Sequence, residues 1–98
     1  MDETLTNELR TSGRISERQE TLWRDVAPLM AAFDAIGREG VSALVKIDGE
    51  RPNGAVYTVV ITGPRLGEKF FRQDGRDLPI LLRAAIEFYR AAAWSSPD

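Results

Sequence analysis

Side chains able to perform covalent or metal chemistry are scarce in this sequence. Its 98 residues contain no histidine and no cysteine, which removes the most common general base, the thiolate nucleophile and two frequent metal ligands. Asp74 and Asp77 lie close together, but Asp77 precedes a helical pattern and is expected to cap that helix. Lys46 and Lys69 fall in predicted strands, where they are expected to be solvated. We therefore expect no enzyme, no catalytic, cofactor-binding or metal-binding residue, and no small-molecule substrate.

Three arginines are the residues best suited to bind a charged group. Arg51 lies in the first predicted hairpin loop, Arg72 near the end of the third predicted strand, and Arg76 at the start of the last predicted helix. An antiparallel meander brings these segments to one end of the molecule, and a helix N-terminus favours anions. One interpretation is a contact site for phosphate or for a partner's carboxylates. The alternative is that neighbouring acids neutralise the arginines as surface ion pairs. These acids are Asp48, Glu50, Asp74 and Asp77.

A long amphipathic helix is predicted ahead of the strands. Residues 16–19 have the form of a capping box, and apolar residues then recur at helical spacing to about Arg38. Pro28 interrupts the pattern because proline lacks the N–H that a helix interior needs. Either the helix kinks, or a second helix begins with Asp25 as its cap and Pro28 in its first turn.

Alternating apolar residues and turn signals predict three strands, at 41–48, 55–62 and 68–73. Short connections make these strands an antiparallel meander. A last helix follows, with Asp77 as its cap and Pro79 in its first turn. The order α-β-β-β-α predicts a two-layer α+β domain, with a three-stranded antiparallel meander and two helices packed on one face.

The domain boundaries follow from the same pattern. We expect a flexible N-terminal tail over residues 1–14, a single α+β domain over 15–94 and a frayed C-terminus over 95–98. The alternative for the tail is a short arm that becomes ordered on a partner.

The strand register predicts an apolar surface on the far side of the sheet from the helices. Pairing Ile47 with Ala55 in the first hairpin directs one set of alternating residues toward the helices. The opposite side, here called the outer sheet face, then carries four apolar residues, which is more than a solvated sheet face normally has. It is interpreted as a protein interface, with cover by the N-terminal helix and no functional meaning as the alternatives. Trp23 is either a second anchor of this interface or a residue at the edge of the core. The four apolar residues are Leu44, Val56, Val60 and Phe70.

Charge and composition indicate which partners and which cellular location to expect. The net charge is −2, and the body beyond the first 20 residues is neutral, so nucleic acid is not an expected partner. The acidic first residues lack the apolar stretch of a signal peptide, so none is expected, and no apolar run is long enough to span a membrane. We therefore expect a cytoplasmic protein. Arginine far exceeds lysine, which we interpret as the mark of a GC-rich bacterial genome.

The predicted element order resembles that of double-stranded-RNA-binding domains. Those domains grip RNA with the first helix, the first hairpin loop and a lysine-rich start to the second helix. Here residues 75–79 contain one arginine and no lysine, and the loop 49–54 contains no histidine. The resemblance covers element order alone, and it implies nucleic-acid binding as the alternative function.

The leading expectation is therefore a non-enzymatic protein-interaction domain of the immunity, inhibitor or adaptor type. Its partner would be another protein, or a second copy bound through the outer sheet face.

Overall fold

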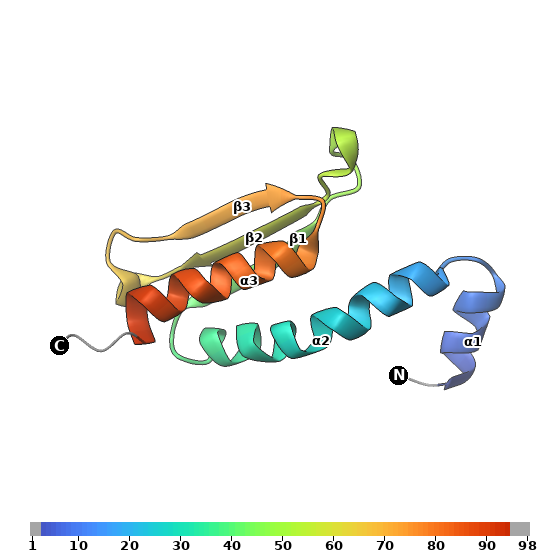
Figure 1. Cartoon of the computed structure of the whole chain (residues 1–98), viewed down its shortest axis with the longest axis horizontal. Coiled ribbons are helices and arrows are strands. Elements are labelled where there is room, and N and C mark those ends of the chain that lie inside the picture. Colours follow the sequence, from blue (N-terminus) through green and yellow to red (C-terminus); the bar gives the residue numbers. More distant parts are fainter. Residues whose placement is uncertain (1–2, 95–98) are drawn as a thin grey trace.

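Three strands and two of the three helices form a two-layer α+β body in the computed structural model, which describes residues 3–94. The sheet order is β1-β2-β3 with antiparallel neighbours, and α2 and α3 lie on one side of it (Figure 1). The predicted α+β class and the three-stranded meander are confirmed. The elements are α1 (Glu3–Thr11), α2 (Glu17–Gly37), β1 (Ser42–Ile47), β2 (Tyr57–Thr62), β3 (Phe71–Gly75) and α3 (Leu78–Tyr89), followed by a π-helical turn (Arg90–Trp94).

Helix α2 begins at the predicted capping box and continues through Pro28. The Ser16 side chain accepts a hydrogen bond from the backbone N–H of Gln19, whose side chain accepts one in return from the Ser16 N–H. The helix is continuous, so the alternative of a second helix capped by Asp25 is wrong. Figure 1 shows α2 bending near its middle. Pro28 explains the bend, because it leaves the carbonyl of Arg24 without its helical donor.

The first hairpin differs from the predicted register by two residues. Ile47 pairs with Tyr57 rather than with Ala55. The loop is longer than expected because it holds a 3-10 turn at Pro52–Gly54, and the N–H of Asp48 reaches the carbonyl of Val56 at 2.7 Å. Since side chains alternate with a period of two, this shift leaves every residue on its predicted face.

The third strand begins later than predicted. It starts at Phe71 and runs through Asp74 to Gly75, rather than over 68–73. A 3-10 turn at Pro64–Leu66 occupies the preceding segment, and the N–H of Lys69 donates to the carbonyl of Leu66 there. Residues 67–70, which follow this turn, lie outside the ladder.

The core lies between α3, the second half of α2 and the inner face of the sheet. Helix α3 begins where predicted, because the Asp77 side chain accepts a hydrogen bond from the N–H of Ile80. The Phe71 ring packs against Phe88 with 5.7 Å between centroids. The most buried core residues are Val26, Phe33, Ile36, Val59, Ile61, Leu78, Leu82, Ala85 and Tyr89.

Helix α1 lies within residues 1–14, the segment expected to be a flexible tail. It ends in a Schellman motif, in which Gly13 adopts φ +77° and donates to the carbonyl of Arg10, while the N–H of Arg14 donates to the carbonyl of Leu9. None of its residues is buried. The predicted frayed end, 95–98, lies outside the described residues.

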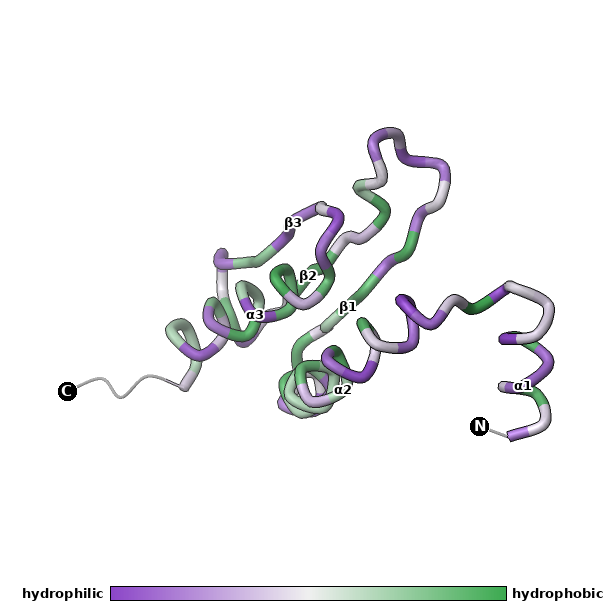
Figure 2. The backbone as a smooth tube through the Cα atoms, turned by 45° about the vertical axis from the view of Figure 1, so that its right-hand side comes forward, coloured by the Kyte–Doolittle hydropathy of each residue, from purple (hydrophilic) through white to green (hydrophobic). Residues whose placement is uncertain are grey.

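The chain is elongated rather than spherical. Its extents are 54 × 30 × 19 Å and its radius of gyration is 15.8 Å, against about 13 Å for a compact domain of this length. Figures 1 and 2 show the reason: α1 and the first part of α2 project away from the α/β body. We call residues 3–25, which end just before the first buried residue Val26, the arm.

Candidate functional site

The outer sheet face is open within the described part of the chain. Helices α2 and α3 lie on the opposite side of the sheet, and α1 lies beyond its edge (Figure 1). The alternative of cover by the N-terminal helix is therefore not realised in this chain. On the open side, Leu44 pairs with Val60, which in turn pairs with Arg72.

Three of the four predicted residues form one apolar patch there. Leu44 is 50% exposed and Phe70 is 64% exposed. Phe70 immediately precedes the buried Phe71, the first residue of β3; if the alternation of β3 is extended by one residue, Phe70 falls on the outer side, next to the row of Val60 and Arg72. We call Leu44, Val60 and Phe70 the sheet patch.

The two other predicted interface residues lie elsewhere. Val56 is half-buried at the far end of the outer face, separated from Val60 by the row of Thr58. Trp23 is on α2 within the arm and is 39% exposed. Trp23 thus belongs to a helix that lies on the other side of the sheet from the sheet patch defined above.

A polar network occupies the end of the outer face near the hairpin loop. The buried hydroxyl of Thr58 donates to Asp74 Oδ1 at 2.6 Å. Arg51 Nη1 lies 2.9 Å from the same oxygen, and Arg51 Nε lies 3.7 Å from Asp48 Oδ2. The hydrogen bond from Thr58, and after it the Arg51 guanidinium, lowers the pKa of Asp74 below its ordinary value.

This network changes the interpretation of the three arginines. Arg51 is ion-paired with two carboxylates, as the predicted alternative held, and its side chain is only 22% exposed. Arg72 and Arg76 are exposed, and Arg76 lies beside the hairpin loop at Gly54. Asp77 is engaged as the α3 cap. The cluster thus offers two exposed guanidinium groups rather than three.

Sequence reasoning missed a second polar cluster, centred on Glu39. Tyr89 donates to Glu39 Oε1 at 2.8 Å, and Trp94 Nε1 lies 3.0 Å from both carboxylate oxygens. Arg65 Nη2 is 3.7 Å from Oε1. The donors from Trp94 and then Tyr89 lower the pKa of Glu39, while burial and then the Glu39 contact raise the pKa of Tyr89. No local sequence signal indicates these contacts, because the partners are 50 and 55 residues away from Glu39.

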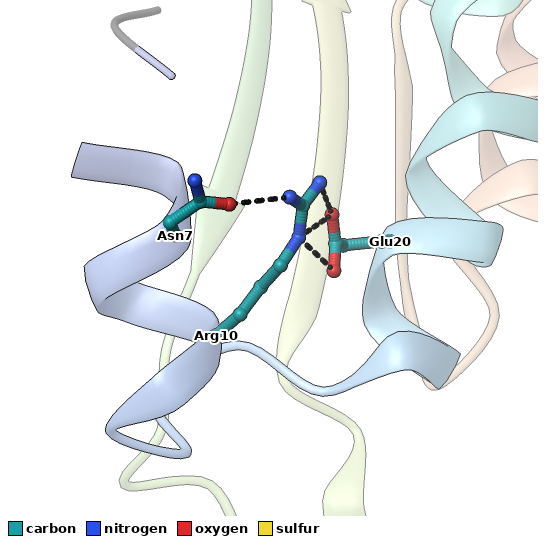
Figure 3. A network of polar contacts seen from close by, with 3 residues as sticks. All are labelled: Asn7, Arg10 and Glu20. Atoms are coloured by element: carbon teal, nitrogen blue, oxygen red, sulfur yellow. Dashed lines mark hydrogen bonds and ion pairs between the residues drawn. The ribbon is translucent and has the colours of Figure 1, made fainter. Parts of the chain in front are cut away.

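A third polar contact fixes the arm. Arg10 Nε donates to both carboxylate oxygens of Glu20 at 2.9 Å, and Arg10 Nη1 donates to the side-chain oxygen of Asn7 (Figure 3). This contact joins α1 to α2. It raises the pKa of Arg10 and lowers the pKa of Glu20, chiefly through the hydrogen bonds between the two groups.

Metal-binding and membrane-spanning features are not found among residues 3–94. No three metal-binding side chains in that range are grouped so that they could hold an ion. No helix in the same part of the chain has the length and apolarity needed to cross a membrane.

The fold and the surface define the chain as a two-layer α+β domain with an open sheet face. No protein-family model, curated protein or solved structure matches it.

Proposed function

We propose that this chain is a non-enzymatic protein-interaction domain that binds its partner through the outer sheet face. The observation that carries the proposal is the sheet patch, which the chain's own helices leave uncovered. Its role would be that of an adaptor, inhibitor or immunity-type protein, which acts by binding to and covering a surface of its partner.

The composition of the patch suits a protein partner. Exposed apolar side chains that adjoin one another often mark interfaces in small proteins. Arg72 borders the patch at the row of Val60, and arginine and phenylalanine are enriched in protein interfaces. Phe70 is the side chain best placed to enter a partner's pocket, because it is large and 64% exposed.

The test compares two substitutions of equally exposed apolar residues. Phe70→Glu changes the sheet patch, whereas Ile80→Glu changes a side chain on α3 that is 60% exposed. Circular dichroism should show that both variants fold. Tagged wild-type and variant chains would then be used for affinity capture in the native host, with quantitative mass spectrometry.

We expect at least one protein to be captured by the wild type and by Ile80→Glu but lost with Phe70→Glu. The proposal is overturned if no captured protein depends on Phe70. Self-association through the outer sheet face is the second form of the proposal, and it predicts that Phe70→Glu converts a dimer into a monomer.

The nucleic-acid alternative is less well supported, because Arg51 is already ion-paired. Two exposed arginines, Arg72 and Arg76, are still available for contacts with phosphate groups. Filter binding with duplex RNA at low salt tests it, since binding through phosphate contacts is strongest there and weakens steeply as salt is added. Retention at low salt that is lost on the double substitution Arg72→Glu and Arg76→Glu would support this alternative.

A further inference from the structure

Helix α1 lacks the support that a short helix needs from its own chain. It has nine residues and none of them is buried, whereas isolated helices shorter than about 12–15 residues are marginal in water. Its C-terminal end is nevertheless well specified, by the Schellman motif at Gly13 and by the Arg10–Glu20 contact. An element with defined geometry and no burial is typical of a segment that packs against another molecule.

The accessible surface of the chain is large enough to accommodate an interface of ordinary size. Its accessible surface is 6932 Å², whereas a compact monomer of this mass exposes about 5,600 Å². The excess of roughly 1,300 Å² is more than the approximately 800 Å² that each partner buries in a standard interface. The arm projects from the α/β body (Figures 1 and 2), so a partner bound to the arm would cover part of this excess.

The arm carries its own apolar surface. A shallow hollow between α1 and α2 is lined mostly by apolar atoms, with Ile15 and Trp23 as its large side chains. Leu5 is 46% exposed and lies one turn before the half-buried Leu9 on α1. Tryptophan at the rim of an apolar hollow is a common anchor at binding hot spots.

The charges of the arm favour a second copy over a strongly charged partner. Residues 3–25 contain four arginines and five acids, which are interspersed along the arm. Two such arms do not repel each other, and their mixed charges can pair when like surfaces meet. In a two-fold dimer the same surface serves both partners, so Trp23 of each chain would face the hollow of the other.

We propose that the arm is a self-association element, and that two copies of this chain pack arm against arm with Trp23 and Ile15 at the centre of the contact. This surface is separate from the outer sheet face, which would remain free in the dimer. The proposal therefore does not depend on a different protein binding to the outer sheet face, but it excludes self-association through that face.

The experiment measures the solution mass of the full chain by light scattering and sedimentation equilibrium over a wide range of concentrations. The wild type should form a dimer of twice 10.9 kDa. Trp23→Glu should weaken dimerisation about 30-fold or more, as loss of a hot-spot residue does. Leu5→Glu should weaken it as well, and this second variant cannot disturb the core because α1 contributes nothing to it. Phe70→Glu is the matched control and should leave the dimer intact.

Hydrogen exchange gives a second readout. The amides of α1 should exchange slowly in the wild-type dimer and quickly in Trp23→Glu, while β1–β3 stay protected in both. A wild type that is monomeric at every concentration would overturn the proposal, as would a dimer that survives both arm substitutions. Loss of the dimer in Phe70→Glu alone would also overturn it and would assign self-association to the outer sheet face instead.

Discussion

The hydroxyl group of Tyr89 donates a 2.8 Å hydrogen bond to Glu39, a residue 50 positions earlier in the chain. This contact joins the end of α3 to the turn between α2 and β1. It also satisfies a phenol that is fully buried, and such a group is costly to leave without a partner. Trp94 adds a second donor and packs edge-on against the Tyr89 ring, with 5.2 Å between centroids.

Glu39→Gln should make the protein less stable at neutral pH, and the difference should disappear in acid. In the wild type, the hydrogen bonds from Trp94 and Tyr89 hold the pKa of Glu39 below its ordinary value of 4.5. The stabilisation is therefore fully present above pH 4.5 and is lost as the pH falls through the lower pKa of the folded state. Thermal melting of both proteins between neutral and acidic pH checks this, with the exposed Glu68→Gln as control. A difference in Tm that stays constant down to acidic pH would contradict the prediction.

Leu82→Ala should lower the free energy of unfolding by about 2–5 kcal/mol, the usual cost of such a cavity. Leu82 on α3 is completely buried, whereas Ile80 on the same helix is 60% exposed. Each kcal/mol corresponds to about 4–8 °C in Tm for a domain of this size. Urea unfolding measures the loss, and Ile80→Ala should stay within about 0.5 kcal/mol of the wild type. Similar losses in the two variants would be inconsistent with a core centred on Leu82.

Gly13→Ala should destabilise the corner between α1 and α2. Gly13 has φ +77°, and a side chain there costs about 1–2 kcal/mol in backbone strain even though nothing lies within 4 Å of the added Cβ. Gly49 also has open space but lacks a positive φ, so Gly49→Ala is the matched control. Hydrogen exchange should become faster in α1 of Gly13→Ala and stay unchanged in the sheet. Unaltered exchange in α1 would show that the Schellman motif does not hold this helix.

Thr58→Val should raise the pKa of Asp74 toward its ordinary value. The substitution keeps the shape of the side chain but removes the hydroxyl that donates to Asp74 Oδ1 at 2.6 Å. The Arg51 guanidinium remains 2.9 Å away, so part of the lowering of the pKa should persist. Titration of the side-chain carboxyl by NMR measures the change. An unchanged pKa would mean that Arg51, rather than Thr58, is the main cause of the lowered value.

Local patterns in the sequence predicted the elements but not all of their ends. The capping box at Ser16 and the cap at Asp77 were both correct, because a cap depends on residues within one turn. The start of β3 was misplaced, since the turn before it is held by hydrogen bonds that composition does not reveal. Helix α1 was missed because it has few apolar residues, and apolar periodicity is the main helical signal.

The sequence alone determined the α+β class and the two faces of the sheet. The predicted register was wrong by two residues, but the predicted faces were not affected, because an even shift leaves each side chain on the same side of the sheet. The alternation of apolar residues was therefore sufficient to assign Leu44, Val60 and Phe70 to one surface.

Only the tertiary structure decided which charged side chains form ion pairs and hydrogen bonds, and in which direction the arm projects. Arg51 is paired with Asp74 across the sheet, Glu39 is bound by residues 50 or more positions away, and α1 stands clear of the body. The contacts of Arg51 with Asp74 and of Glu39 join segments distant in sequence. The free energy of such a contact depends on distance and burial in the folded chain, so residue type and spacing along the sequence do not reveal it.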